Sequence, residues 1–305
     1  MRTWLRAACR RWLPPAVLRA RRVALSMPRV VVRKSWQLRR LAARRAAAAP
    51  DAVLAYPFRP HIEDDYTLTH IAYRLGLRLT SDPATSYAAA IYWHDTTRRP
   101  ASPALERISR SMHVMNLFGN DISKTRVDAA MREVFGYGLG VDPRVTQGPF
   151  VDKSDSNALH DGRIVPGPLP NPDTGRVYQR LIRGRHVDGL VEEIRVPVIG
   201  DGVPFVYLKY KPPDDALSLS VRGTVADAST VLTNDEIGLL VRLSHSLGID
   251  FGELDVMRDS ADGRIYVFDA NNTPCVRFVG VTGADRRATI DRLAESFEAA
   301  FLLTH

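Results

Sequence analysis

The 305-residue sequence lacks the features that identify several broad classes of protein. Its two cysteines, Cys9 and Cys275, lie far apart in the chain and fit no zinc spacing, so neither a disulfide framework nor a zinc site is expected. No apolar run approaches the ~18 residues of a transmembrane helix, and arginines interrupt the first dozen residues where a secretory signal would be apolar. These absences predict a cytoplasmic protein, either soluble or peripheral at the inner membrane surface.

Acidic residues are absent from residues 1–50, which contain 13 arginines and Lys34. The rest of the chain carries 28 basic and 34 acidic side chains and is mildly acidic. Trp4 and Trp12 are interleaved with the arginines, a mixture that suits an anionic membrane surface or an acidic partner bound through residues 1–45. Nucleic acid is a rival ligand because arginines attract phosphates without reading bases, but it is not the expected partner. A solvated arm without a partner, or an organelle transit peptide, is the remaining alternative.

A hairpin is expected over residues 252–274, with one carboxylate on each strand. The dipeptide Asp262-Gly263 is typical of a hairpin turn, and residues 265–268 favour a buried strand. If the strands pair, Asp255 and Asp269 converge, and the amide oxygen of Asn271 adds a third hard ligand. Such oxygen ligands suit Mg²⁺ held against a polyphosphate better than zinc or haem iron. Nucleotide chemistry is therefore the first hypothesis.

Strands and helices alternate along the rest of the chain, which predicts a mixed α/β or α+β body. The ranges expected to be strands are 52–56, 88–93, 177–182, 192–199 and 203–210. The ranges expected to be helices are 66–75, 125–135, 234–247 and 284–303. Residues 166–172, rich in Pro and Gly, are expected to form a flexible connection. His94 and Asp95 follow a buried strand, where they either contact substrate or form an ordinary loop.

Lysine is scarce, with 5 residues against 37 arginines, so each lysine is a candidate for a specific role. A compact ammonium group suits phosphate oxygens as a point charge, whereas the guanidinium fork of arginine suits a bidentate partner. Lys124 opens a predicted helix, and Lys153 ends a short apolar stretch. Both are candidate nucleotide contacts, and scatter over the surface is the alternative.

The lysine segments, the strand at residues 177–182 and the hairpin follow one another in an order that resembles the ATP-grasp superfamily over about residues 116–275. Members of that family bind ATP between two α+β lobes and mostly join a carboxylate to an amine through an acylphosphate. The segments that carry the resemblance are residues 116–124, Lys153, residues 178–182 and Asp255 through Asn271. The resemblance implies an ATP-grasp fold of two α+β lobes, preceded by a small α/β domain and a basic N-terminal extension. The implied boundaries are 1–50 for the extension, 51–115 for the α/β domain, 116–185 for the small lobe and 186–305 for the large lobe.

The resemblance also implies roles for individual residues. Lys124 and Lys153 would contact the phosphates of ATP, and Gln179 and Leu181 in the hinge strand would contact the base. The residues implied as Mg²⁺ ligands are Asp255, Asp269 and Asn271. Arg195 would meet the transferred phosphate, and Lys209, or alternatively Lys211, would lie near the same place on the return strand.

Three features depart from the family pattern. Arg180 stands where an acidic residue is common, and Asp269 is one methylene shorter than the usual Glu. The loop at residues 154–162 has a single glycine where a phosphate lid is usually rich in glycine. The expected function is an ATP- and Mg²⁺-dependent ligase that forms a carbon–nitrogen bond between a small-molecule carboxylate and an amine. The alternatives are a kinase of the same fold and a nucleotide-binding scaffold with a weakened site, tethered by its basic arm.

Overall fold

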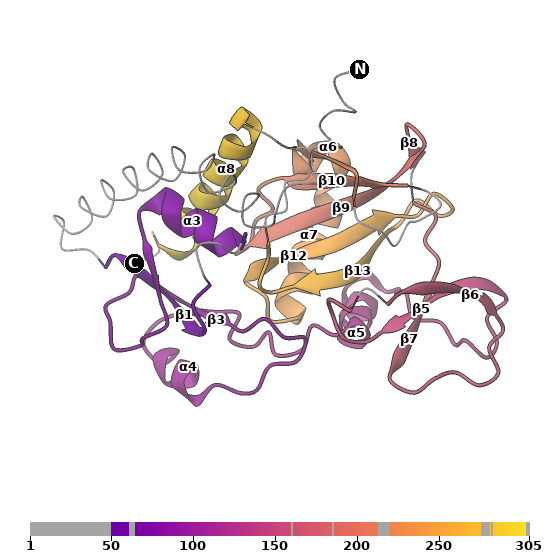
Figure 1. Cartoon of the computed structure of the whole chain (residues 1–305), viewed down its shortest axis with the longest axis horizontal. Coiled ribbons are helices and arrows are strands. Elements are labelled where there is room, and N and C mark those ends of the chain that lie inside the picture. The colour runs from indigo at the N-terminus through magenta and orange to yellow at the C-terminus, as the bar shows by residue number, and fades with distance from the viewer. Residues whose placement is uncertain are drawn as a thin grey trace, which may run out of the picture.

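The protein is described here by a computed structural model (Figure 1). The structure describes residues 50–60, 65–159, 161–184, 186–212, 220–275, 281 and 283–302. The arm at residues 1–45, with its expected membrane or partner contacts, lies outside these described residues. Within them, no helix combines the length and the apolar character needed to cross a bilayer.

The first sheet is parallel, with strand order β2-β1-β3-β4. Its strands are β1 (Ala52–Pro57), β2 (Arg78–Thr80), β3 (Ala89–Trp93) and β4 (Val114–Met115). Helix α3 (Thr67–Leu75) connects β1 to β2 and ends where Gly76 adopts the left-handed conformation, with φ of 67°. The short helix α4 (Pro103–Ile108) lies between β3 and β4. The buried strands β1 and β3 confirm the predicted α/β character of this segment.

The second sheet is antiparallel, with order β11-β10-β9-β12-β13, and β8 pairs with β9 outside this path. Its strands are β8 (His186–Val187), β9 (Leu190–Ile199), β10 (Val206–Lys211), β11 (Arg222–Ala226), β12 (Phe251–Arg258) and β13 (Ile265–Asn271). Alternation along β9 sends Ile194, Val196 and Val198 into a hydrophobic core, so that Glu193 and Arg195 occupy the opposite face. One face of this sheet is therefore apolar and the other carries charge.

Helices α5 (Lys124–Phe135) and α7 (Asn234–Ser246) contribute to the core on the apolar face. The helix α7 begins with a capping box, in which Thr233 and Glu236 satisfy each other's backbone N–H groups. The short helix α6 (Ala228–Val231) precedes it. Helix α8 (Gly283–Phe301) packs beside α3 and joins a second core that spans the parallel sheet and the end of β9 (Figure 1).

The third sheet has the order β6-β5-β7 and lies at the far end of the molecule from α3 (Figure 1). Its strands are β5 (Gly148–Ser154), β6 (Arg163–Gly167) and β7 (Arg176–Arg180). The expectation of a flexible connection over residues 166–172 is wrong at its start, because Pro166 and Gly167 belong to β6. A proline is tolerated there because β6 is an edge strand, whose outward N–H groups need no partner in the ladder.

Candidate active site

A row of charged side chains crosses three neighbouring strands of the large sheet. Asp269 on β13 lies opposite Asp255 on β12, and Asp255 lies opposite Arg195 on β9. Directly opposed residues in antiparallel strands point to the same face, so these three side chains share the polar face of the sheet. The predicted convergence of Asp255 and Asp269 is thus confirmed. A register irregularity follows Asp255 in this hairpin.

Asp255 is held by two cations. Arg195 donates from Nε to Oδ1 at 2.8 Å and from Nη2 to Oδ2 at 3.0 Å, and Lys209 Nζ donates to Oδ1 at 3.0 Å. Burial alone would raise the pKa of Asp255, but Arg195 and Lys209 outweigh it and hold the pKa well below the usual range. The carboxylate is therefore firmly ionised. The same carboxylate, with Glu253, raises the pKa of Arg195 against the opposing effect of burial.

Two further acids stand on this polar face. Glu193 lies opposite Lys209 in the β9–β10 pair, forms an ion pair with it, and reaches Lys211 Nζ at 2.6 Å. Glu253, on β12 two residues before Asp255, has Oε2 at 3.5 Å from Arg195 Nη1. Burial raises the pKa of Glu253 to about 7 despite the nearby Arg195. Arg195 and Lys209 are each shared between two acids of this polar face, whereas Lys211 pairs with Glu193 alone among the described residues.

Buried oxygens of Glu193, Glu253 and Asp269 all lack a hydrogen bond, but only those of the two glutamates have a cation within ion-pair distance among the described residues. The Oδ1 of Asp269 is buried and accepts no hydrogen bond from any residue that the structure describes. Burial is the main reason that the pKa of Asp269 is raised, with Lys124 and Lys153 acting in the opposite direction. A buried, unsatisfied carboxylate oxygen is costly unless a cation or a donor completes it. This oxygen suits a hard cation such as Mg²⁺.

The other two predicted metal ligands, Asn271 and Asp255, differ in how many oxygen lone pairs remain for a cation. Asn271 Oδ1 accepts the Thr273 backbone N–H at 2.9 Å and lies 3.3 Å from Thr273 Oγ1. The Thr273 hydroxyl has one proton and is closer to Asp95, at 3.0 Å, so the second lone pair of Asn271 Oδ1 is open to a further partner when that proton goes to Asp95. Asp255 accepts three N–H groups, whereas a carboxylate offers about four acceptor positions. The donor set of two carboxylates and one amide oxygen therefore fits Mg²⁺, with Asp269 as the least satisfied member.

Lys153 and Lys124 belong to elements outside the large sheet, β5 and α5. Lys153 Nζ, on β5, donates to the Phe268 carbonyl on β13 at 3.2 Å and lies 5.6 Å from the centre of the Phe268 ring. Burial lowers the pKa of Lys153 to about 8, and Asp269 counteracts the shift. Lys124 Nζ donates to the Ser156 carbonyl and to Asn157 Oδ1, at 2.9 and 3.0 Å. Lys153 therefore contacts β13 directly, and Lys124, at the start of α5, is near enough to Asp269 on β13 to lower its pKa.

The hinge residues connect the small sheet to the large one. Gln179 on β7 is buried, and Leu181 follows the end of this strand half-buried. Arg180 leaves the opposite face of β7, where its Nη2 donates to Asp259 Oδ2 at 2.8 Å and its guanidinium lies 4.6 Å from the centre of the Tyr266 ring. The departure at position 180 thus has a structural role, since Arg180 joins β7 to the end of the β12–β13 hairpin.

Polar residues in the segments that follow β4 and β3 bind the end of the hairpin where β12 begins and β13 ends. Asn116, fully buried with φ of 58°, accepts the Phe251 N–H at 2.9 Å and donates to the carbonyls of Phe251 and Asn272 at 2.8 and 3.2 Å. Thr273 Oγ1 donates to Asp95 Oδ1 at 3.0 Å. The loop that contains Asp95 therefore lies beside the predicted metal ligands.

Glu193, Glu253 and Asn157 belong to this site but were not predicted from the sequence. Glu193 and Glu253 each lie two residues before a predicted site residue on a strand, so the period of two would have placed them on the same face. Asn157 donates from Nδ2 to the Ala270 carbonyl at 2.9 Å, which ties the loop after β5 to β13. No local pattern marks that long-range contact.

Comparisons with models of protein families and with curated protein sequences find no match. Solved structures do match. The ATP-grasp ligase PsnB, bound to a precursor peptide and AMPPNP, is 14% identical with a TM-score of 0.52, over 81% of this chain and 96% of that chain. The same ligase with minimal precursor, Mg and ADP is 15% identical with a TM-score of 0.51, over 81% and 98%.

Other alignments are shorter. D-alanine–D-alanine ligase from Bacillus anthracis is 13% identical with a TM-score of 0.47, over 74% of this chain and 84% of that chain. In two further PsnB structures the alignment covers 67% and 65% of the PsnB chain. The agreement with PsnB over most of both chains shows that this protein has the ATP-grasp fold, as the sequence predicted.

Proposed function

We propose that the protein is an ATP- and Mg²⁺-dependent ligase that joins a carboxylate to an amine through an acylphosphate. The single observation that carries this proposal is the unused, buried Oδ1 of Asp269. Asp269 lies in a row with Asp255 and Arg195 on the polar face of the large sheet. Lys124 and Lys153 are close enough to lower its pKa. An acid oxygen buried among cations, in the ATP-grasp fold, is the arrangement expected where a metal–nucleotide complex binds.

Each predicted residue has a defined part in this proposal. Asp255, Asp269 and Asn271 would hold Mg²⁺, which when bound neutralises charge on the β- and γ-phosphates. Lys124 and Lys153 would bind phosphate oxygens, and Gln179 and Leu181 would contact the base. Lys153 is suited to this because its ammonium has no ion-pair partner among the described residues, so a phosphate would complete it.

Arg195 and Lys209 would stabilise the charge that develops as the phosphoryl group moves. Both are already oriented by Asp255, and a guanidinium held by two carboxylates requires little rearrangement when the transferring phosphate arrives. The phosphoryl group would pass from ATP to the carboxylate oxygen of the substrate and release ADP. The amine nitrogen would then attack the acyl carbon, form the C–N bond and release phosphate.

The substrate classes are a carboxylate and an amine, either as small molecules or as groups on a peptide. The peptide option is included because the PsnB structures contain a precursor peptide. Asp95 and Thr273 lie next to Asn271 and are the described residues best placed to contact the acceptor.

The test is ADP release from Mg²⁺-ATP in the presence of paired carboxylates and amines, followed by mass spectrometry of the products. The ligase proposal expects ADP, free phosphate and a new amide in equal amounts. A phosphorylated acceptor without an amide would identify a kinase. Nucleotide binding without turnover of any pair would favour the scaffold alternative.

A further inference from the structure

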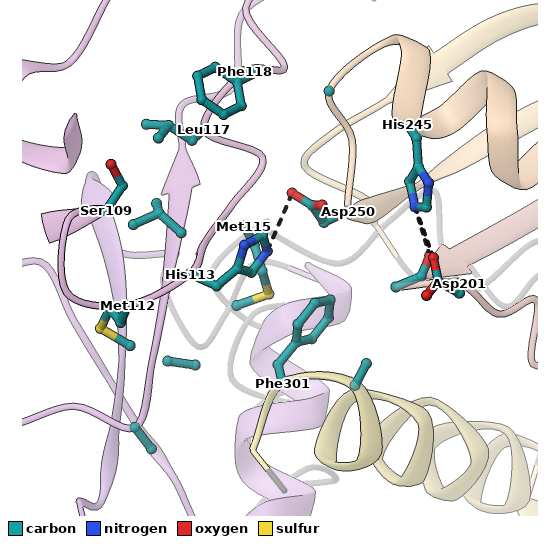
Figure 2. Close-up of a pocket in the computed structure, with 16 residues that line it drawn as sticks. Ser109, Met112, His113, Met115, Leu117, Phe118, Asp201, His245, Asp250 and Phe301 are labelled. Carbon is teal, nitrogen blue, oxygen red and sulfur yellow. Dashed lines mark hydrogen bonds and ion pairs between the residues drawn. The ribbon is translucent and has the colours of Figure 1, made fainter. Parts of the chain in front are cut away.

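A pocket of about 630 Å³ lies between the parallel sheet, the turn after β9 and the end of α8 (Figure 2). It opens where the amino ends of β3 and β4 meet the turn after β9 and the end of α8. Its apolar wall includes Met112, Met115, Leu117, Phe118 and Phe301. Phe118 is 79% exposed, an unusual state for a phenylalanine in the part of the chain that the structure describes.

The polar side of the pocket is acidic. Asp250 and Asp201 each face an imidazole, with His113 Nε2 at 3.7 Å from Asp250 Oδ2 and His245 Nε2 at 3.5 Å from Asp201 Oδ1 (Figure 2). Asp201 is 94% exposed, and no lysine or arginine is among the described lining residues. A group that combines an apolar body with positive charge would therefore complement the pocket.

The path of the chain brings such a group to this place. Pro50 and Asp51 lead into β1, and the Ala52 carbonyl accepts the N–H of Ala88, a lining residue, at 2.8 Å. The segment before Pro50 therefore joins the described structure beside the pocket. Lys34 precedes Pro50 by 16 residues, which can span up to about 50 Å when extended, so the length of the connection is sufficient.

The composition of that segment matches the pocket. Residues 33–41 read Arg-Lys-Ser-Trp-Gln-Leu-Arg-Arg-Leu, with four cations, no acid and three large apolar side chains. An aromatic and aliphatic segment suits the apolar wall with its exposed Phe118, and four cations suit Asp201 and Asp250. We propose that this pocket is the docking site, in the same molecule, of residues 33–41, which hereafter are called the basic segment.

The test uses the full-length chain and a carbodiimide, which joins an amine directly to a carboxylate. Lys34 is the one lysine within residues 1–50, so its adducts are unambiguous among lysines of the arm. Mass spectrometry should find Lys34 linked to Asp201 or Asp250. Mixing ¹⁵N-labelled and unlabelled protein should show that the link forms within one molecule.

The informative variant is Phe118→Arg, which adds a cation at the mouth of the pocket on an exposed side chain and leaves the core intact. Adduct formation should fall at least about fivefold, and trypsin should cleave after Arg39 several times faster. Phe58→Arg is the matched control, because Phe58 is 59% exposed and is not a lining residue. It should change neither measurement.

Links that form only between molecules would assign the pocket to a second copy and overturn the proposal. Links from Lys34 only to carboxylates outside the pocket would also overturn it. The same holds if the adduct is absent and trypsin cleaves the wild type and Phe118→Arg at equal rates. If anionic vesicles protect Arg39 equally in both proteins, the basic segment serves a membrane surface instead.

Discussion

Arg195 and Asp255 face each other across the central strand pair of the large sheet and form a bidentate ion pair, with N–O distances of 2.8 and 3.0 Å. Both side chains are largely buried, at 22% and 15% exposed. A planar guanidinium matches a carboxylate in this geometry, which fixes both groups more firmly than a lysine could. The pair therefore sets the position of the neighbouring acids.

Replacement of Arg195 by alanine should destabilise the protein strongly. The change leaves Asp255 and Glu253 buried without their main counter-charge, and breaking a buried pair from one side typically costs about 3–5 kcal/mol. The free energy of unfolding from urea denaturation measures this. Arg144→Ala is the control, because Arg144 forms an equally bidentate but exposed pair with Asp142 and should have little effect. Equal stability of both variants would contradict the role of Arg195 in the network.

The buried Glu253 should make stability depend on pH. Its pKa rises from an ordinary 4.5 to about 7 on folding, so the folded state binds this proton more tightly than the unfolded chain. The resulting stabilisation is present below about pH 4.5 and is lost as the pH rises to about 7.

Glu253→Gln should remove this dependence. Relative to the wild type, the variant should gain about 1–3 kcal/mol in free energy of unfolding between pH 5 and pH 8. Urea denaturation at the two pH values measures the difference. A constant difference between variant and wild type would show that Glu253 stays ionised in the folded protein.

Replacement of Lys153 should weaken ATP binding without lowering the free energy of unfolding. The Lys153 pKa of about 8 means that the folded state holds the lysine proton less tightly than the unfolded chain, so below pH 8 the charged lysine opposes folding. Lys153→Met should therefore leave the free energy of unfolding at pH 7 unchanged or higher, while ATP affinity falls at least about tenfold. Lys211→Met is the contrast, because it leaves the buried Glu193 without one of its two cations and should destabilise the fold. Calorimetric titration and urea denaturation of both variants decide between the roles.

Arg180 should hold the small sheet to the hairpin. Arg180→Ala removes the bond to Asp259, which is 1% exposed, and should cost about 1–3 kcal/mol because that acid loses its cation. Hydrogen exchange should become faster in β5 and β7 and remain unchanged in β1 and β3. Uniform exchange across all four strands would show that Arg180 does not link the two parts.

Local patterns were sufficient to predict the elements that carry the site. The Asp262-Gly263 turn predicted the hairpin and its pairing as far as Val256 and Val267. The register shift between Asp255 and Val256, which no local pattern predicted, places Asp255 opposite Asp269 rather than Phe268. The expected helices at residues 66–75 and 234–247 also match α3 and α7 to within one residue at each end. Such features depend on a few adjacent residues, so the sequence contains all the information that they need.

Long-range pairing could not be read in this way. The edge strand β6 contains Pro166 and Gly167, which favour a loop, yet pairing with β5 overrides that preference. The bonds of Asn157 to Lys124 and Ala270, and of Asn116 to residues near position 251, join segments more than 30 positions apart. Only the folded arrangement reveals that these polar side chains support one site.

Calorimetric titration of the full-length protein with ATP, with and without Mg²⁺, tests the central claim most directly. The account predicts Mg²⁺-dependent binding to the wild type that is lost at least about tenfold in Asp269→Ala and Asn271→Ala. Asp173→Ala should behave as the wild type, because Asp173 is 70% exposed and its atoms lie no closer than 3.9 Å to the cation of Arg163. Binding that is unaffected by Mg²⁺, or equally tight in all four proteins, would contradict the assignment of Asp269 and Asn271 to a metal–nucleotide site.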